Sequence, residues 1–447
     1  MVKGIARTTL RDDCSSTSKM DTLLLFLTGI VSVIVFCKEY LLIHIPEIVI
    51  ILLFSFFFLF TNAKHMYFAM SLCFMLELWI PFTYIVIVGA AINLLRFQDF
   101  EYISKDLLIG IVFIVFQLFS VFAEGLSISI LGKVGISFFA QIYLFSSIHN
   151  VKESTSFAYG IVVGFVILSF MTLLIATKYM RLASIILQFR LGSNTMTRWI
   201  PQDVLIPNEN NLARYAVFAI TVVIVLHDTK RLSSFFYYSY ISYSIIIILL
   251  TKSRSGLALL LLTFLTLYFI TGRYKKRSAK MIRDILLLVV SLFAIILIVD
   301  YFMPNLIPSI MSRFNEEDLS NGRVENFKFY HDVWVSKTRW ILFGFGDQNV
   351  SSRFSRYNSV HSAIQAYFVH YGIFGFSIFM LFLVSHIKHY SSRLLQKRTL
   401  ICWLPIFIVG VGKLFGAMNT TELLVAIAIS TLYINDYCQG VNCEKQV

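Results

Sequence analysis

Charged side chains are scarce in this chain: they make up 14% of its 447 residues, against about 25% in soluble globular proteins. Hydrophobic residues reach 57% and gather in runs of about 15 to 30 residues, long enough to cross a hydrocarbon layer about 30 Å thick as helices. An ordinary soluble enzyme is therefore excluded. The composition predicts an all-α, polytopic integral membrane protein.

Features that would indicate other classes of protein are also missing. The six cysteines form no CxxC pair, which argues against a disulfide framework or a zinc site. No DxD motif indicates a metal, so no metal or cofactor is predicted. No A-x-A site follows the first apolar run, and we expect no cleaved signal peptide. The net charge of +13 is spread over short loops, so a patch for nucleic acid is not predicted.

The apolar runs give about thirteen candidate spans, and no repeat of roughly 20–50 residues is visible among them. The runs cover residues 22–36, 46–60, 66–95, 107–122, 128–148, 157–176, 212–226, 235–250, 255–270, 285–303, 362–384, 400–415 and 423–434. The whole chain, 1–447, is predicted to be a single polytopic membrane domain. The apolar runs are most broken in the first 150 residues.

Basic loops set the expected orientation. Short loops at 272–283 and 387–398 are rich in Lys and Arg, and such loops stay in the cytoplasm. They bracket the polar stretch 304–360, which is therefore predicted to be a large outer loop over the active site. The break at 251–254 and the polar segment 178–211 are expected on the same outer side. Thirteen spans would leave the basic N-terminal tail outside, so about twelve spans with both ends cytoplasmic are preferred.

Arg254 is the first candidate for function, because it lies between two apolar runs in TKSRSGLALLLL with almost no loop around it. An arginine held near the membrane costs about 3 kcal/mol or more unless it is paired, and such residues are functional candidates. Guanidinium groups bind phosphate oxygens bidentately. Ser253, Ser255 and Gly256 suit a helix start, where free N–H groups add anion affinity. We therefore predict a site for a lipid diphosphate.

The predicted outer loop carries further basic residues, for which a solvated face is an equally good explanation. They are Arg313, Arg323, Lys328, Lys337, Arg339, Arg353 and Arg356.

His361 is the second candidate, in NSVHSAIQAYFVHYGIFGF, where the outer loop is predicted to enter a span. Neutral imidazole has an ordinary pKa of about 6.5 and is the usual general base near neutral pH. His361 would take the proton from a sugar hydroxyl; an interfacial histidine that caps the helix is the alternative. His370, inside the predicted span, is expected to pack in the core.

Several motifs together resemble those of one family. SRSGLALL is followed by NGRVENFKFYHDVW, by an F-G-F-G turn at 343–346 and by NSVHSAIQAYFVHYGIFGF, and PNENNLARY precedes them at 207–215. This order, over about residues 200–385, resembles the O-antigen ligase and O-antigen polymerase superfamily of bacterial envelope glycosyltransferases. The resemblance implies a GT-C-like fold of about twelve transmembrane helices.

The resemblance also implies roles for particular residues. Arg254 and Arg323 would bind the diphosphate of an undecaprenyl-linked oligosaccharide, and His361 would be the catalytic residue that activates the acceptor. In the family this histidine is commonly followed by Asn, whereas Ser362 follows it here. Further candidates for substrate contacts are Arg353, Arg356, Asn210 and Asn211; surface positions and helix capping explain them about as well.

Two acceptors fit the implied chemistry. An O-antigen polymerase would transfer the glycan to another lipid-linked repeat, and an O-antigen ligase would transfer it to lipid A core. We favour the polymerase, because the chain is rich in Phe, Ile and Tyr and its motifs match weakly. The implied partners are the lipid-linked donor, the glycan or lipid A core acceptor, membrane lipid and a chain-length regulator. The implied location is the bacterial inner membrane, with the active site facing the periplasm or the cell exterior.

A flippase for lipid-linked sugars is the alternative from another class. Transporters of this kind often have repeated halves and charged groups at the midplane. The absence of evident repeats and the few intramembrane acids favour the enzyme.

Overall fold

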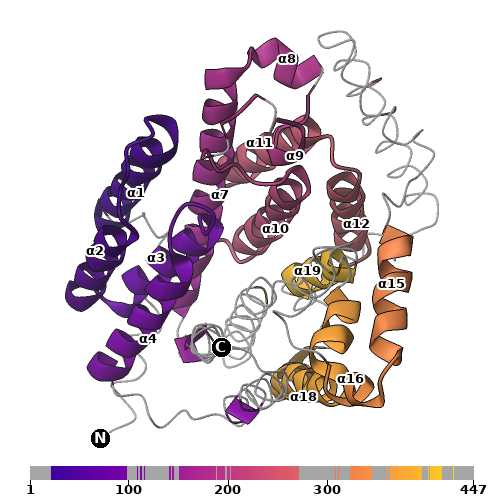
Figure 1. The fold of residues 1–447 in the computed structure, drawn as a ribbon. Coiled ribbons are helices and arrows are strands. Elements are labelled where there is room, and N and C mark those ends of the chain that lie inside the picture. The colour runs from indigo at the N-terminus through magenta and orange to yellow at the C-terminus, as the bar shows by residue number, and fades with distance from the viewer. Residues whose placement is uncertain are drawn as a thin grey trace, which may run out of the picture.

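The computed structural model describes residues 22–97, most of 151–270, 323–344, most of 360–394 and most of 401–414, with single positions between them. All regular elements in these parts are helices (Figure 1). In chain order they are α1 (Thr22–Val35), η2 (Phe36–Tyr40), α2 (Glu47–Phe60), α3 (Ala63–Met75), α4 (Phe82–Phe97), α7 (Val151–Tyr179), α8 (Leu182–Leu187), α9 (Ser193–Met196), α10 (Glu209–Asp228), α11 (Ser234–Thr251), α12 (Arg254–Ile270), α15 (Arg323–Val335), α16 (Thr338–Phe343), α18 (Ala363–Leu394) and α19 (Leu404–Leu414).

Five helices in the described parts are long and apolar enough to cross a membrane. They cover Thr22–Tyr40, Lys152–Tyr179, Glu209–Asp228, Ser234–Thr251 and Ile364–Leu381. Shorter apolar helices cover Glu47–Phe60, Phe82–Arg96 and Arg254–Tyr268. The predicted class, an all-helical membrane protein, is confirmed over the described residues. The total of about twelve spans and the GT-C-like arrangement stay predictions.

One predicted span is wrong. The apolar run 66–95 is two helices, α3 and α4, separated by a turn at residues 76–81. Pro81 lacks a backbone N–H and disfavours helical conformation in the residue before it, so the helix ends ahead of it. The turn is also held from outside, because the Trp79 indole N–H donates to the Leu205 carbonyl at 2.7 Å.

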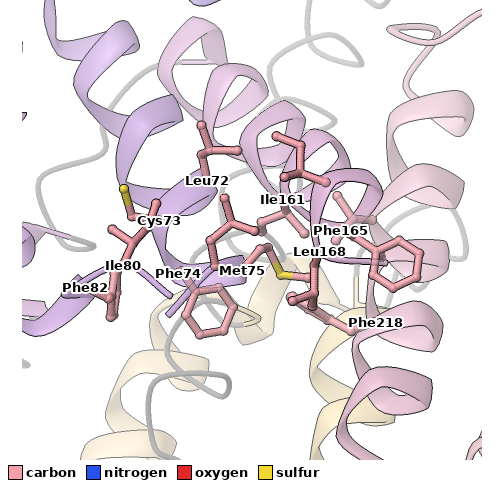
Figure 2. Packing of buried hydrophobic residues seen from close by; sticks show 14 of the residues in the cluster. Leu72, Cys73, Phe74, Met75, Ile80, Phe82, Ile161, Phe165, Leu168 and Phe218 are labelled. Carbon is pink, nitrogen blue, oxygen red and sulfur yellow. The ribbon is translucent and has the colours of Figure 1, made fainter. Parts of the chain in front are cut away.

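The most extensive helix contact joins α3 to α7 in the core (Figure 2). Gly160 and Gly164 of α7 face α3: a Cβ on Gly160 would lie 1.9 Å from the Ser71 Oγ, and one on Gly164 would lie 2.7 Å from the Met75 Cβ. This G-x-x-x-G spacing lets two helix backbones approach closely, which favours association inside a membrane. This contact was not predicted from the sequence.

Hydrogen bonds between distant segments define two ends of the helix bundle. At one end, the Leu191 N–H donates to the Leu250 carbonyl at 3.0 Å, so the segment 178–211 meets the break between α11 and α12. We call this the SRSG end. At the opposite end, the Tyr159 hydroxyl near the start of α7 donates to the Arg231 carbonyl at 2.6 Å. The segments 178–211 and 251–254 therefore lie at the same end, and the location of this end on the outer side stays a prediction.

The N-terminal helices are anchored to the SRSG end. The Glu39 carboxylate, in the π-helical turn η2 after α1, accepts from the Leu205 N–H at 3.2 Å. Lys38 donates to the Trp79 carbonyl at 2.9 Å. Since α1 ends here, its first residue, Thr22, lies toward the opposite end. Thr22 and the polar segment 178–211 thus lie at opposite ends of the bundle, and which end faces the cytoplasm stays a prediction.

A separate unit is built from α15, α16 and α18. Gly344 and Gly372 both have positive φ, 72° and 63°, and each packs on the other's backbone: a Cβ on Gly344 would lie 2.3 Å from the His370 carbonyl, and one on Gly372 would lie 2.4 Å from the Leu342 carbonyl. Gly372 also kinks α18. Helix α19 packs against α10, α12 and α18, so it connects this unit to the bundle.

Candidate functional site

The SRSG end is centred on the turn between α11 and α12. Lys252 takes a left-handed conformation, with φ 48° and ψ 34°, and its N–H donates to the Leu249 carbonyl at 3.1 Å, which ends α11. Ser253 then caps α12, because its hydroxyl accepts from the Gly256 N–H at 3.2 Å. Helix α12 therefore begins at Arg254, and the predicted helix start is confirmed. Arg254 itself is half-buried.

Helix α10 begins beside this turn. The Ser253 hydroxyl donates to the Asn210 side-chain oxygen at 2.7 Å, and Asn208 caps α10 by accepting from the Asn210 N–H at 2.9 Å. Gly256 permits the close approach, since a Cβ there would lie 2.5 Å from the Ala213 Cβ. Two helix N-termini thus converge, and each carries partial positive charge that favours anions.

A third segment, residues 190–192, lies beside the two helix starts. The Arg190 Nε donates to the Thr251 carbonyl at 3.2 Å. Gly192 lies so close to the start of α10 that a Cβ would be 2.5 Å from the Glu209 backbone nitrogen. Glu209 and Lys252 are buried, with 0% and 3% of their surface exposed. The site therefore includes one buried acid and several basic groups from three segments.

The surroundings of Lys252 shift the pKa of its side chain. Burial, together with the neighbouring Arg190 guanidinium, lowers the pKa of its ammonium from 10.5 to about 8. Desolvation and a like charge both disfavour a cation. An anion bound beside Lys252 would therefore gain more than it would from an ordinary surface lysine.

Several basic residues gather at this end of the bundle. Basic residues that lie in or next to its segments are Lys38, Lys178, Arg181, Arg190, Arg214, Lys252 and Arg254. Guanidinium and ammonium groups gathered in this way favour the binding of anions.

The structure brings together some of the predicted site residues. Arg254 and Asn210 lie at the two adjoining helix starts. Asn211 is exposed and accepts a hydrogen bond from Arg214, so a helix-surface role describes it as well as a substrate contact. Arg323 is the first residue of α15, but its side chain is outside the described part. The same holds for His361, Arg353 and Arg356, so the convergence of Arg254, Arg323 and His361 stays a prediction.

The loop motif and the histidine motif pack on one another. Tyr330 of α15 is fully buried with Val360, Ala366 and Val369, and the Gln365 amide donates to the Phe327 carbonyl at 2.6 Å. Burial raises the pKa of Tyr330 to about 12, so it stays protonated. The start of α18, two residues after His361, is therefore held directly against α15.

His370 and the tryptophans of the loop have structural surroundings. His370 is buried, at 7% exposure, as expected for a core histidine. Trp334 lies 5.4 Å from the Phe368 ring, and the Lys337 ammonium lies 4.3 Å from the centre of the Trp340 ring. In the described residues, no three His, Cys, Asp or Glu side chains gather to hold a metal ion.

Comparison with known proteins adds one finding. Residues 240–380 match the family model described as O-antigen ligase. The match includes the turn at 251–254, the whole of α12, α15 and α16, and the first half of α18. No curated protein and no solved structure matches the chain at a significant level.

Proposed function

Because residues 240–380 match the family model described as O-antigen ligase, we propose that the chain is a membrane glycosyltransferase acting on lipid-diphosphate-linked glycans. In our proposal it is an O-antigen polymerase in lipopolysaccharide or surface polysaccharide synthesis. The donor is an undecaprenyl-diphosphate-linked oligosaccharide, and the SRSG end faces the periplasm of a bacterial inner membrane. The observation that carries the proposal is that the start of α12 with Arg254, inside the matched segment, lies beside the start of α10, which is outside it.

In the proposed mechanism the protein supplies charge and a base. The donor diphosphate lies against Arg254 and Arg323, where guanidinium groups stabilise the charge that develops as it leaves. His361 removes the proton of an acceptor sugar hydroxyl. That oxygen bonds to the anomeric carbon of the donor while the bond from this carbon to the phosphate oxygen breaks. The lipid diphosphate departs as an anion, and the proton stays on His361.

A ligase is the second candidate, and the family description favours it. It would use the same donor site and the same base, and its acceptor would be a lipid A core sugar. The difference lies only in what occupies the acceptor side of the site, so the choice must come from an assay that offers both acceptors.

The test uses the full-length protein in lipid nanodiscs with purified lipid-linked repeat units. We expect longer glycans on the lipid carrier, and their loss in Arg254→Ala and His361→Ala. Matched controls lie at the opposite end: Lys230→Ala, and His227→Ala, whose ring stacks on Tyr237 at 4.2 Å. If both site variants elongate glycan like the parent, the assignment is wrong. If glycan appears on lipid A core instead, the protein is a ligase.

A further inference from the structure

We propose that Lys252 and Arg190 are further diphosphate-binding residues that act beside Arg254. The inference rests on the proposed function, because the ligand is the diphosphate of the lipid-linked donor. It adds two cations that the sequence motifs do not indicate: Arg190 is outside the matched segment, and Lys252 lies between the two helices whose break forms the site.

The backbone around Lys252 is built by long-range contacts. The Arg190 Nε and the Leu191 N–H donate to the carbonyls of Thr251 and Leu250 at 3.2 and 3.0 Å. These two bonds bind the segment before α9 to the last turn of α11, so Arg190 and Lys252 are held as neighbours. Arg254 follows two residues further on, so the proposal places three cations around the start of α12.

Like charges in one buried place oppose folding, and a multivalent anion relieves them. Lys252 is almost fully buried, although a lysine that ends a helix in this way can remain exposed to solvent. Lys230 shows this: it also has a left-handed backbone, with φ 60°, in the turn after α10 at the opposite end, but it is exposed. A diphosphate carries up to three negative charges, so it can engage more cations than a monophosphate can.

Other charged groups belong to the elements packed around Lys252. Glu209 and Arg214 belong to α10, Arg254 to α12 and Arg190 to the segment before α9. Glu209 is the acid among these groups, and the other three are arginines, a residue type that is effectively always charged in proteins. Among the basic groups of the described site, Lys252 is therefore the one whose charge changes near pH 8.

The test measures binding of undecaprenyl diphosphate and undecaprenyl monophosphate to the full-length protein in nanodiscs at pH 7 and pH 9. At pH 7, we expect Lys252→Met and Arg190→Gln each to bind the diphosphate about tenfold more weakly, as for loss of one charge-assisted hydrogen bond. Binding of the monophosphate should change less. Lys230→Met is the matched control and should bind like the parent.

The pH arm separates a binding role from a structural one. A lysine with a pKa of about 8 is only about one-tenth protonated at pH 9, so the parent should bind the diphosphate up to about tenfold more weakly there than at pH 7. Lys252→Arg keeps its charge and should lose this dependence. A purely structural Lys252 would leave affinity unchanged in every folded variant.

Each outcome decides the inference. The inference is overturned if folded Lys252→Met binds the diphosphate within twofold of the parent. It is also overturned if Lys252→Arg loses as much affinity between pH 7 and pH 9 as the parent does. In either case, glycan elongation by the parent would still support the proposed function. If Lys252→Met does not fold, the diphosphate affinity of Arg190→Gln and the pH dependence of Lys252→Arg test the inference instead. A parent protein that binds neither lipid overturns the inference and the proposed function together.

Discussion

Replacing Gly256 by alanine tests whether the close approach of α10 and α12 positions Arg254. The new methyl carbon would lie 2.5 Å from the Ala213 Cβ, whereas carbon atoms are in contact at about 3.5–4.0 Å. The two helix starts must therefore separate by about 1 Å or more. Overpacking of this kind costs about 1–3 kcal/mol. The 2.7 Å bond between Ser253 and Asn210 joins the same two helices, so the shift also stretches it.

A size swap makes the experiment specific. Ala213→Gly removes the methyl that Gly256→Ala would meet, at a cost of up to about 1 kcal/mol in helix propensity. We expect Gly256→Ala to lower both the Tm and glycan elongation, and the double variant to recover most of each. Thermal unfolding and elongation measured for the four proteins give a coupling energy, expected at about 1–3 kcal/mol.

The control is Gly410→Ala in α19, where a Cβ would meet nothing within 4 Å. It should leave the Tm and the activity close to those of the parent. The reasoning is refuted if Gly256→Ala behaves like this control, or if Ala213→Gly further destabilises the Gly256→Ala protein, since the two methyls would then not be in conflict.

Three more predictions concern other parts of the molecule. Gly160→Ala, whose Cβ would lie 1.9 Å from the Ser71 Oγ, should lower the Tm by several degrees, whereas Gly29→Ala, with nothing within 4 Å, should not; equal Tm values would contradict the packing. Gly372→Ala, at φ 63° and 2.4 Å from the backbone at the end of α16, should expose the α15–α16 segment to limited proteolysis and reduce elongation, and an unchanged cleavage pattern would count against it. Lys252→Met should stabilise the protein at pH 7 by up to about 3 kcal/mol, because a lysine pKa lowered from 10.5 to about 8 disfavours the charged form by that amount. The penalty is complete below pH 8 and disappears as the pH rises towards 10.5, so unfolding scans from pH 7 to 10 should converge; a variant less stable than the parent at pH 7 would refute the sign.

Much of the helix pattern follows from local sequence. The predicted runs 46–60, 212–226, 235–250 and 255–270 lie within or close to α2, α10, α11 and α12, because uninterrupted apolar residues in a membrane must satisfy their backbone hydrogen bonds as helices. The break at 251–254 was also predictable, since a serine before Arg254 is a normal helix cap.

The run 66–95 shows where hydropathy is insufficient. Its residues are apolar on both sides of the turn, and average hydrophobicity does not report a break. Pro81 was a local signal, but the hydrogen bond from Trp79 to Leu205 was not, because 126 residues separate its two ends. Gly160 and Gly164 can be recognised in the sequence as a G-x-x-x-G pair, but the sequence does not indicate which helix they contact.

The sequence alone was enough to predict the membrane class, the superfamily resemblance and the helix start at Arg254. It also named the candidates Asn210, Arg323 and His361. Composition, capping residues and motif order are properties of the sequence itself and need no knowledge of how the helices pack. Only the tertiary structure placed Asn210 against Ser253 and buried Lys252 beside Arg190. Those neighbours come from segments that are far apart in the chain. Their contacts depend on how α10, α11 and α12 pack, and no local pattern encodes that packing.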